Sequence, residues 1–215
     1  MSKNALIVWG GWNGHTPEEC AELFAPWLRS EGFDVEVSET LDSYTDRELM
    51  ESLDLVVPMW TMGQISGEQA AGLLEAVERG TGIAGFHGGM CDSFRNNTQY
   101  QWMTGGQWVA HPGGCIPSYK VEVTDDSHEI TKGLASFEMR DTEQYYMHVD
   151  PSNRVLATTT FDSGCVMPYV WTRTWGDGRV FYAAFGHTYR DFEIPEALEI
   201  VQRGMIWAAR TSSGD

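Results

Sequence analysis

The sequence contains little positive charge. Its 215 residues include 14 lysines and arginines against 31 aspartates and glutamates, which gives a net charge of −17 at pH 7. A chain this acidic repels phosphate backbones and anionic lipid headgroups. We therefore expect neither a nucleic-acid partner nor binding to a membrane surface.

Cysteine is also scarce, and the few cysteines are far apart. They are Cys20, Cys91, Cys115 and Cys165, and no two of them form a CxxC pair. Zinc ribbons and small disulfide-bonded domains depend on closely spaced cysteines. The spacing therefore predicts free thiols, as expected in a reducing compartment.

Long apolar runs and targeting segments are missing as well. No run approaches the roughly 18 apolar residues that span a bilayer. The first residues, Met-Ser-Lys-Asn, lead directly into a strand-like segment without the parts of a secretory signal. We expect a cytoplasmic protein with a single domain over residues 1–211 and a short frayed tail at 212–215.

Apolar strands and amphipathic helices alternate in the first 90 residues. Strands are predicted at 5–9, 33–37, 53–60 and 83–86. One helix is predicted to begin at Pro17 with Thr16 as its N-cap, another after Ser66 with Gln69 in the capping-box position, and a short one at 46–51. This alternation predicts a doubly wound, mostly parallel α/β sheet with ligands at the carboxyl ends of the strands.

The rest of the chain is less regular. Residues 100–114 are rich in Gly, Gln and Trp, and we interpret them as a loop-rich insertion over the site. Further strands are predicted at 119–123, 155–161, 169–175 and 180–185, and Asp177-Gly178 is typical of a tight hairpin turn. A final amphipathic helix begins at Pro195. The α/β sheet is thus expected to carry an added β-hairpin and a loop insertion.

The fourth predicted strand ends at a histidine between glycines. Gly85, His87 and Gly89 have the spacing of a nucleophile elbow, a sharp turn from strand to helix that raises its central side chain above the sheet. In a hydrolase the central residue would be Ser or Cys. Here the geometry of the elbow is predicted, but the usual nucleophile is replaced by an imidazole.

Several segments along the chain match the motifs of one known family. They lie at 82–87, 105–112, 126–131, 143–145, 175–182, 186–187 and 204–209. Together they resemble the ThuA-like (trehalose utilisation) family, within the class I glutamine amidotransferase-like, flavodoxin-like fold. The resemblance implies metabolism of trehalose or of a related or oxidised glycoside, without defining a reaction.

The resemblance also indicates which chemistry is missing. The amidotransferase relatives have a cysteine at the elbow and a histidine after a late strand. His187 corresponds to that histidine, but His87 stands where the cysteine would be. Because imidazole cannot readily replace a thiolate nucleophile, we expect no glutaminase activity. Cys91, four residues beyond the elbow, is a less favoured nucleophile, since a lone cysteine is more often a buried small residue.

Histidines at strand ends and one carboxylate are the candidates for chemistry. We predict that His87, His187 and Glu143 act as acid/base groups or bind a divalent metal, either zinc, nickel, iron or manganese. There is no short-spaced pair such as His-x-His, so a metal site requires these distant residues to converge. In the alternative interpretation, each histidine only bonds to a neighbouring loop, as expected for His128.

Aromatic and polar residues near the same strand ends predict a carbohydrate-binding surface. Tryptophan faces stack on the apolar faces of sugars, while carboxylates, amides and imidazoles bind hydroxyls. The predicted substrate-binding residues are His15, Trp60, Asp92, Gln107, Trp108, His111 and Tyr145. Packing in the core is the alternative role for the tryptophans.

Two classes of function fit these features. The first is an enzyme that acts on a sugar by hydrolysis, elimination or isomerisation. The second is a non-catalytic sugar-binding or assembly protein that has kept the fold and lost the chemistry. The loop at 10–14 lacks the G-x-G-x-x-G spacing, so no nucleotide cofactor is expected. Exposed helices in such a fold are compatible with a homodimer.

Overall fold

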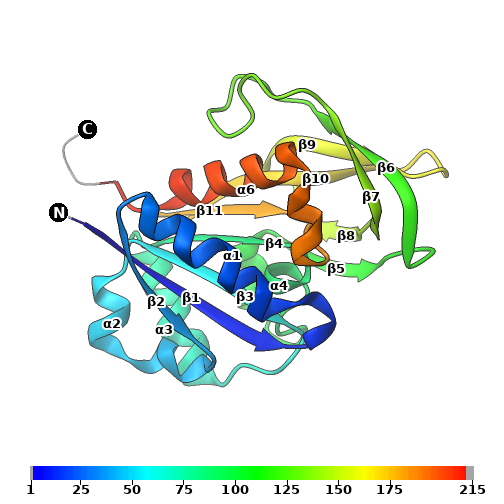
Figure 1. The fold of residues 1–215 in the computed structure, drawn as a ribbon. Helices are drawn as coiled ribbons and strands as arrows, with labels where there is room; N and C mark the ends of the chain where they lie inside the picture. Colours follow the sequence, from blue (N-terminus) through cyan, green and yellow to red (C-terminus); the bar gives the residue numbers. More distant parts are fainter. Residues whose placement is uncertain (1, 212–215) are drawn as a thin grey trace.

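The computed structural model describes residues 2–211, so the predicted tail at 212–215 lies outside the described residues. At its centre is a nine-stranded sheet with the order β2-β1-β3-β4-β11-β10-β9-β6-β7 (Figure 1). The first five strands in this order are parallel: β2 (Phe33–Ser38), β1 (Lys3–Gly11), β3 (Leu55–Thr61), β4 (Gly82–Phe86) and β11 (Gly178–Ala183). This order is that of the flavodoxin-like fold, which confirms the predicted fold class.

The other four strands extend the sheet in antiparallel fashion. They are β10 (Val166–Trp175), β9 (Arg154–Thr160), β6 (Cys115–Val123) and β7 (Phe137–Glu143). β5 (Gly106–Ala110) and β8 (Tyr146–Val149) form a separate two-stranded sheet. The predicted hairpin is present as β10 and β11, and the antiparallel part is larger than this hairpin.

Helices cover both faces of the parallel strands (Figure 1). On one face lie α1 (Pro17–Ser30) and α6 (Pro195–Ala208). On the other lie α2 (Arg47–Ser52), α3 (Gly67–Glu78), α4 (His87–Cys91) and α5 (Thr98–Thr104). Short 3₁₀ helices occur at η1 (Asn13–His15), η2 (Leu41–Thr45) and η3 (Tyr189–Glu193).

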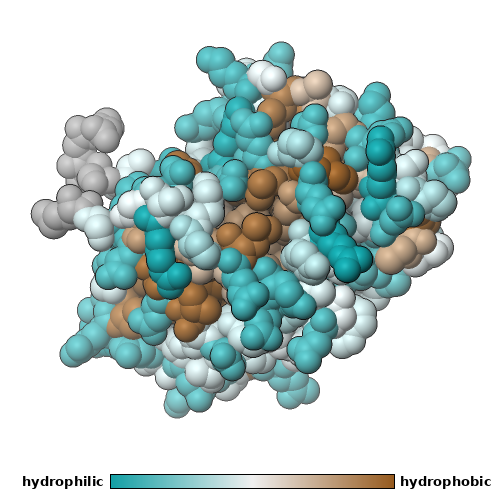
Figure 2. All heavy atoms as spheres, viewed as in Figure 1, coloured by the Kyte–Doolittle hydropathy of each residue, from teal (hydrophilic) through white to brown (hydrophobic). Residues whose placement is uncertain are grey.

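The central parallel strands form the core because both of their faces are covered. Every residue of β4 is buried, as is every residue of β3 except Trp60. Such strands appear in a sequence as continuous apolar runs. The outer surface is more mixed: on the face with α1 and α6, hydrophilic side chains are widely spread and hydrophobic ones gather across the middle (Figure 2). No helix among residues 2–211 is long and apolar enough to cross a membrane.

One local prediction was wrong, and another was confirmed only in part. Residues 100–114 are not mainly loop, because they contain the end of α5 and the whole of β5. Thr16 lies at the N-cap position of α1, as predicted, but its side chain makes no capping hydrogen bond: its φ is 46°, and its Oγ1 accepts a hydrogen bond from the N–H of Tyr189 at 3.0 Å. The capping box of α3 is confirmed, with Ser66 and Gln69 bonding to each other's backbone.

Candidate active site

His87 occupies the sharp turn between β4 and α4. Its φ of 46° lies in the left-handed region, which is unfavourable for a residue other than glycine. The neighbouring glycines are required by close packing. A Cβ at Gly85 would lie 2.7 Å from Met90, and one at Gly89 would lie 3.1 Å from Met59. The elbow predicted from the sequence is therefore present, with an imidazole at its centre.

Four segments bring three histidines and one glutamate together at the carboxyl ends of the parallel strands. His15 belongs to η1, His87 to the elbow, and His187 follows β11, whereas Glu143 is the last residue of β7. One potential ligand atom from each residue lies within 4.8 Å of the others. We call these four residues the His/Glu cluster.

The Oε2 atom of Glu143 is the common neighbour of the three histidines. It lies 3.2 Å from Nε2 of His87, 3.4 Å from Nδ1 of His187 and 4.0 Å from Nε2 of His15. The second oxygen, Oε1, lies 3.6 Å from Nδ1 of His111. Glu143 thus presents one oxygen to the cluster and the other to a histidine outside it.

Hydrogen bonds orient two of the imidazole rings. Nδ1 of His87 lies 2.9 Å from the carbonyl oxygen of Ala184, and because a carbonyl can only accept, Nδ1 carries the proton. Nε2 of a neutral His87 therefore directs a lone pair at Glu143. Nδ1 of His15 lies 2.8 Å from Oγ1 of Thr61, which leaves Nε2 of His15 facing the cluster.

Burial favours uncharged imidazoles. It lowers the pKa of His87, and it lowers the pKa of His15 from 6.5 to about 2, with repulsion from His87 and His187 adding to the effect. Burial also raises the pKa of the Glu143 carboxyl, but the His187 and His87 rings outweigh it and hold this pKa well below its usual range. At neutral pH the Glu143 carboxylate therefore lies beside His15 and His87, two rings for which burial disfavours the charged form.

Three predicted substrate-binding residues flank the cluster. Tyr145 stacks on His87 with ring centroids 3.8 Å apart. The ring centroids of Trp108 and His111 lie 6.2 Å and 6.4 Å from that of Tyr145, on the side of the cluster formed by β5. Gln107 belongs to the same strand, and its Nε2 donates to the carbonyl of Trp108 at 3.1 Å.

Trp60 and Asp92 are engaged with other parts of the protein. The Trp60 ring lies against Gly10 and Gly11, where added Cβ atoms would come within 2.5 Å and 3.0 Å of it. Asp92 is buried and accepts two hydrogen bonds from Arg95, at 2.6 Å and 3.0 Å. Burial raises the pKa of the Asp92 carboxyl, and Arg95 opposes the rise.

Asp191 supports the cluster and was not predicted. Its Oδ2 accepts hydrogen bonds from the N–H of Gly186 at 3.1 Å, the N–H of His187 at 2.9 Å and the hydroxyl of Thr142 at 2.8 Å. One buried carboxylate thus joins the turn that carries His187 to the strand that carries Glu143. Nothing in the local sequence distinguishes Asp191 from a surface aspartate of a helical turn.

The cysteines contribute no nucleophile at this site. All four are free thiols, as predicted. Cys91 is buried in α4, and burial raises the pKa of its thiol far above the usual value. Since the thiolate is the reactive form, the structure argues against the less favoured hypothesis of a Cys91 nucleophile.

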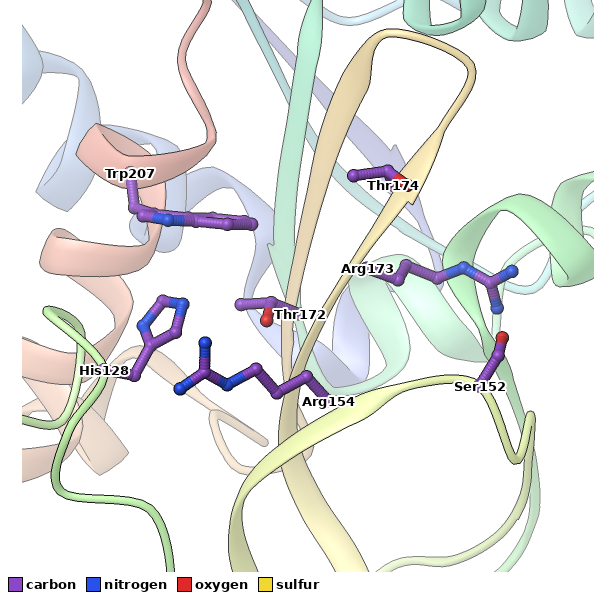
Figure 3. A pocket seen from close by; sticks show the side chains of 7 residues that line it. All are labelled: His128, Ser152, Arg154, Thr172, Arg173, Thr174 and Trp207. Carbon is purple, nitrogen blue, oxygen red and sulfur yellow. The ribbon is translucent and has the colours of Figure 1, made fainter.

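A separate groove of about 360 Å³ lies beside α6 (Figure 3). It is lined by His128, Ser152, Arg154, Thr172, Arg173, Thr174 and Trp207. In Figure 3, Arg154 points toward His128, whereas Arg173 points the other way, toward Ser152. Arg154 is paired with Asp125 at 2.7 Å, and Nδ1 of His128 accepts from the N–H of Ile130 at 3.3 Å. The groove contains no predicted site residue, and His128 has the structural contacts expected of it.

Comparisons with solved structures establish the same fold in ThuA-like proteins. One from Bacteroides uniformis has a TM-score of 0.81 and 19% identity, with 96% of this chain and 91% of that chain covered. One from Parabacteroides merdae has a TM-score of 0.77 and 19% identity, and the match covers 99% of this chain and 93% of that chain. A β-galactosidase from Rahnella sp. R3 has a TM-score of 0.61 and 17% identity; the match covers 98% of this chain but only 32% of the enzyme.

Among curated proteins, none matches this chain. The family model described as "Trehalose utilisation" matches residues 4–208. This match includes the four segments that carry the His/Glu cluster. The chain therefore belongs to the ThuA (trehalose utilisation) family.

Proposed function

We propose that this protein is a metal-dependent enzyme that acts on a sugar or an oxidised sugar derivative by hydrolysis, elimination or isomerisation. The contact between Glu143 and His87 supports this function most strongly. Oε2 of Glu143 and Nε2 of His87 lie 3.2 Å apart, while the Ala184 carbonyl holds the proton of the ring on Nδ1. Two acceptors at this distance repel each other unless a proton or a cation lies between them.

A cation suits this position better than a proton. Burial lowers the pKa values of His87 and His15, so protonated imidazoles are disfavoured. Three imidazole nitrogens and one carboxylate oxygen form a donor set that accepts zinc, nickel, iron or manganese. Ala184 and Thr61 would orient the histidines from behind, as partners of metal-bound histidines commonly do. A bound metal ion would polarise a substrate oxygen and lower the pKa of a bound water.

Residues around the cluster fit the binding of a small polar molecule. His111 is partly exposed and contacts Oε1 of Glu143, so it can bind a substrate hydroxyl beside the metal ligands. The buried ring nitrogen of Trp108 has no hydrogen-bond partner in the described chain. Membership of the trehalose utilisation family makes a carbohydrate the first substrate to test.

A non-catalytic sugar-binding protein is the second candidate. It is favoured by the imidazole at the elbow and by the buried, protonated thiol of Cys91, which leave the amidotransferase reaction without a nucleophile. Binding of a sugar without any turnover by the metal-loaded protein would support this candidate over the enzyme.

Elemental analysis of protein purified without chelators or a metal-binding tag is the first test. We expect close to one zinc, nickel, iron or manganese per chain. His87→Ala and Glu143→Gln should lose the metal, whereas His148→Ala, at an exposed position on β8, should retain it. Absence of metal after metal-supplemented expression, or full metal content in the His87 and Glu143 variants, would reject the metal-dependent function.

A further inference from the structure

One exposed ring and one partly exposed ring border the otherwise buried His/Glu cluster. Trp12, which is 46% exposed, packs its edge against His15 with ring centroids 4.8 Å apart. His111, whose side chain is 37% exposed, contacts Glu143. His15 and His111 approach different oxygens of Glu143. Trp12 and His111 are thus solvent-accessible rings in contact with two different members of the cluster.

The position of the Trp12 ring is well defined although it is exposed. The ring lies on Gly14, where an added Cβ would come within 2.4 Å of it. The N–H of Trp12 donates to the carbonyl of Thr61 at 3.2 Å, and the hydroxyl of Thr61 contacts Nδ1 of His15 at 2.8 Å. Trp12 and the cluster residue His15 are thus held by the same residue, which fixes the indole relative to the ligand atoms.

We infer that Trp12 is a stacking platform that selects a pyranose ring at the mouth of the His/Glu cluster. This inference rests on the proposed function, because it names the substrate class of the same site. A pyranose presents a rigid apolar face of C–H groups that matches an indole, and its hydroxyls project from the edge of the ring. A ring stacked on Trp12 places these hydroxyls next to His15. An acyclic polyol has similar hydroxyls but no rigid face.

Trp102 provides a matched control. It is 61% exposed, more than Trp12, but it packs against Trp175 with ring centroids 5.3 Å apart. Trp175 pairs with Gly178 at the beginning of β11, whereas His187 follows the end of that strand. Trp102 therefore lies at the opposite end of the strand from the cluster, and its loss should not affect a ligand there.

The test compares pyranoses with an acyclic polyol on the metal-loaded full chain. The probes are trehalose, D-glucose and D-sorbitol, followed by saturation-transfer NMR and calorimetry. We expect saturation to be strongest at the C–H protons of the pyranose ring, and sorbitol to bind more weakly than glucose. Trp12→Ala should weaken trehalose binding about tenfold, and Trp12→Phe should weaken it less, since a smaller aromatic face remains. Trp102→Ala should bind like the unmodified protein.

Metal content, measured on the same samples, separates this inference from the proposed function. Equal trehalose affinity in Trp12→Ala and the unmodified protein would overturn the platform, as would sorbitol binding as tight as that of glucose. If the unmodified protein carries its metal but binds neither pyranose, the platform is also overturned, while the metal-dependent site remains. Sugar binding that depends on Trp12 in a protein that takes up no metal would instead support the platform and reject the proposed function.

Discussion

At the scale of single residues, Gly88 is where the elbow touches the His/Glu cluster. A Cβ at this position would lie 2.5 Å from Cε1 of His15 and 3.0 Å from the hydroxyl of Tyr145. Gly88→Ala should therefore displace His15 and lower metal affinity by about 10- to 100-fold, as loss of a ligand's orientation does elsewhere. Gly67→Ala is the matched control, since a Cβ at Gly67 meets nothing within 4 Å. Metal titration of both variants measures this difference in affinity. Equal metal affinities in the Gly88 and Gly67 variants would contradict the predicted displacement of His15.

His15 should make the metal-free protein sensitive to acid. Its pKa is about 2 in the folded chain against 6.5 as the ordinary value, so below pH 6.5 the unfolded chain takes up a proton that the folded chain does not. The free energy of unfolding should then fall as the pH falls, by about 1.4 kcal/mol per pH unit for this residue. Burial lowers the pKa of His87 too, so its contribution has the same sign.

Chemical denaturation between pH 6.5 and about 5 measures this slope. His15→Gln should reduce this slope by nearly the amount that corresponds to one bound proton. His148→Gln, at an exposed position, should leave the slope unchanged. Identical slopes in the His15 variant and the unmodified protein would show that His15 does not carry the effect.

Residue patterns predicted part of the site. His87 and His187 could be placed together because both follow strands that end at the same edge of the sheet. Glu143 was predicted as the carboxylate that could join these histidines, although the strand that carries it was not predicted. Asp191 and Thr61 could not be found, because their roles depend on hydrogen bonds to residues 49 and 46 positions away.

At the scale of elements, η3 holds the turn that carries His187. Asp191→Ala would leave three donors without their acceptor, and each buried unpaired group costs about 1–3 kcal/mol. We expect a loss of roughly 3 kcal/mol or more in the free energy of unfolding, together with weaker metal binding. Asp191→Asn keeps one acceptor oxygen and should be milder. Chemical denaturation and metal titration measure both effects, and Arg190→Ala, at an exposed neighbouring position, is the control. An Asp191→Ala variant with unchanged stability and normal metal affinity would show that Asp191 does not hold this turn.

Local sequence patterns were sufficient to predict the helices and strands of the N-terminal part of the fold. The helices and strands up to β4 follow from caps, apolar periodicity and short connections, as the Ser66–Gln69 capping box illustrates. Residues 98–149 were harder because their pairing is long-range. β5 pairs with β8 through Gly106 and Val149, and β6 pairs with β9 through Val121 and Thr159. Short strands with polar faces carry little signal when their partners are this far away in the sequence.

At the scale of the whole molecule, the metal should stabilise the fold against heat. The four residues proposed as its ligands come from separate segments, so a metal that binds the folded chain and not the unfolded one would shift the folding equilibrium. At a free metal concentration of 100 times Kd, the gain is about 2.7 kcal/mol. For a chain of this size we expect Tm to rise by about 5–10 °C.

Thermal scans with added zinc or manganese measure this shift. His87→Ala should show little or no rise, and calcium, which prefers an all-oxygen site, should give none in the unmodified protein. A Tm that does not respond to any of the metals proposed for the cluster would contradict the coupling between binding and folding.

β11 lies between β4 and β10 in the sheet, although it is the last strand in the sequence of the described residues. During synthesis at about 5–20 residues per second, the edge of β4 that pairs with β11 therefore stays unpaired until residues 178–183 have left the ribosome. The parallel and antiparallel halves join only then, and His187 emerges just afterwards. The nascent chain thus carries an open sheet edge while residues 87–177 are made, and this is the stage at which chaperones would protect it from aggregation.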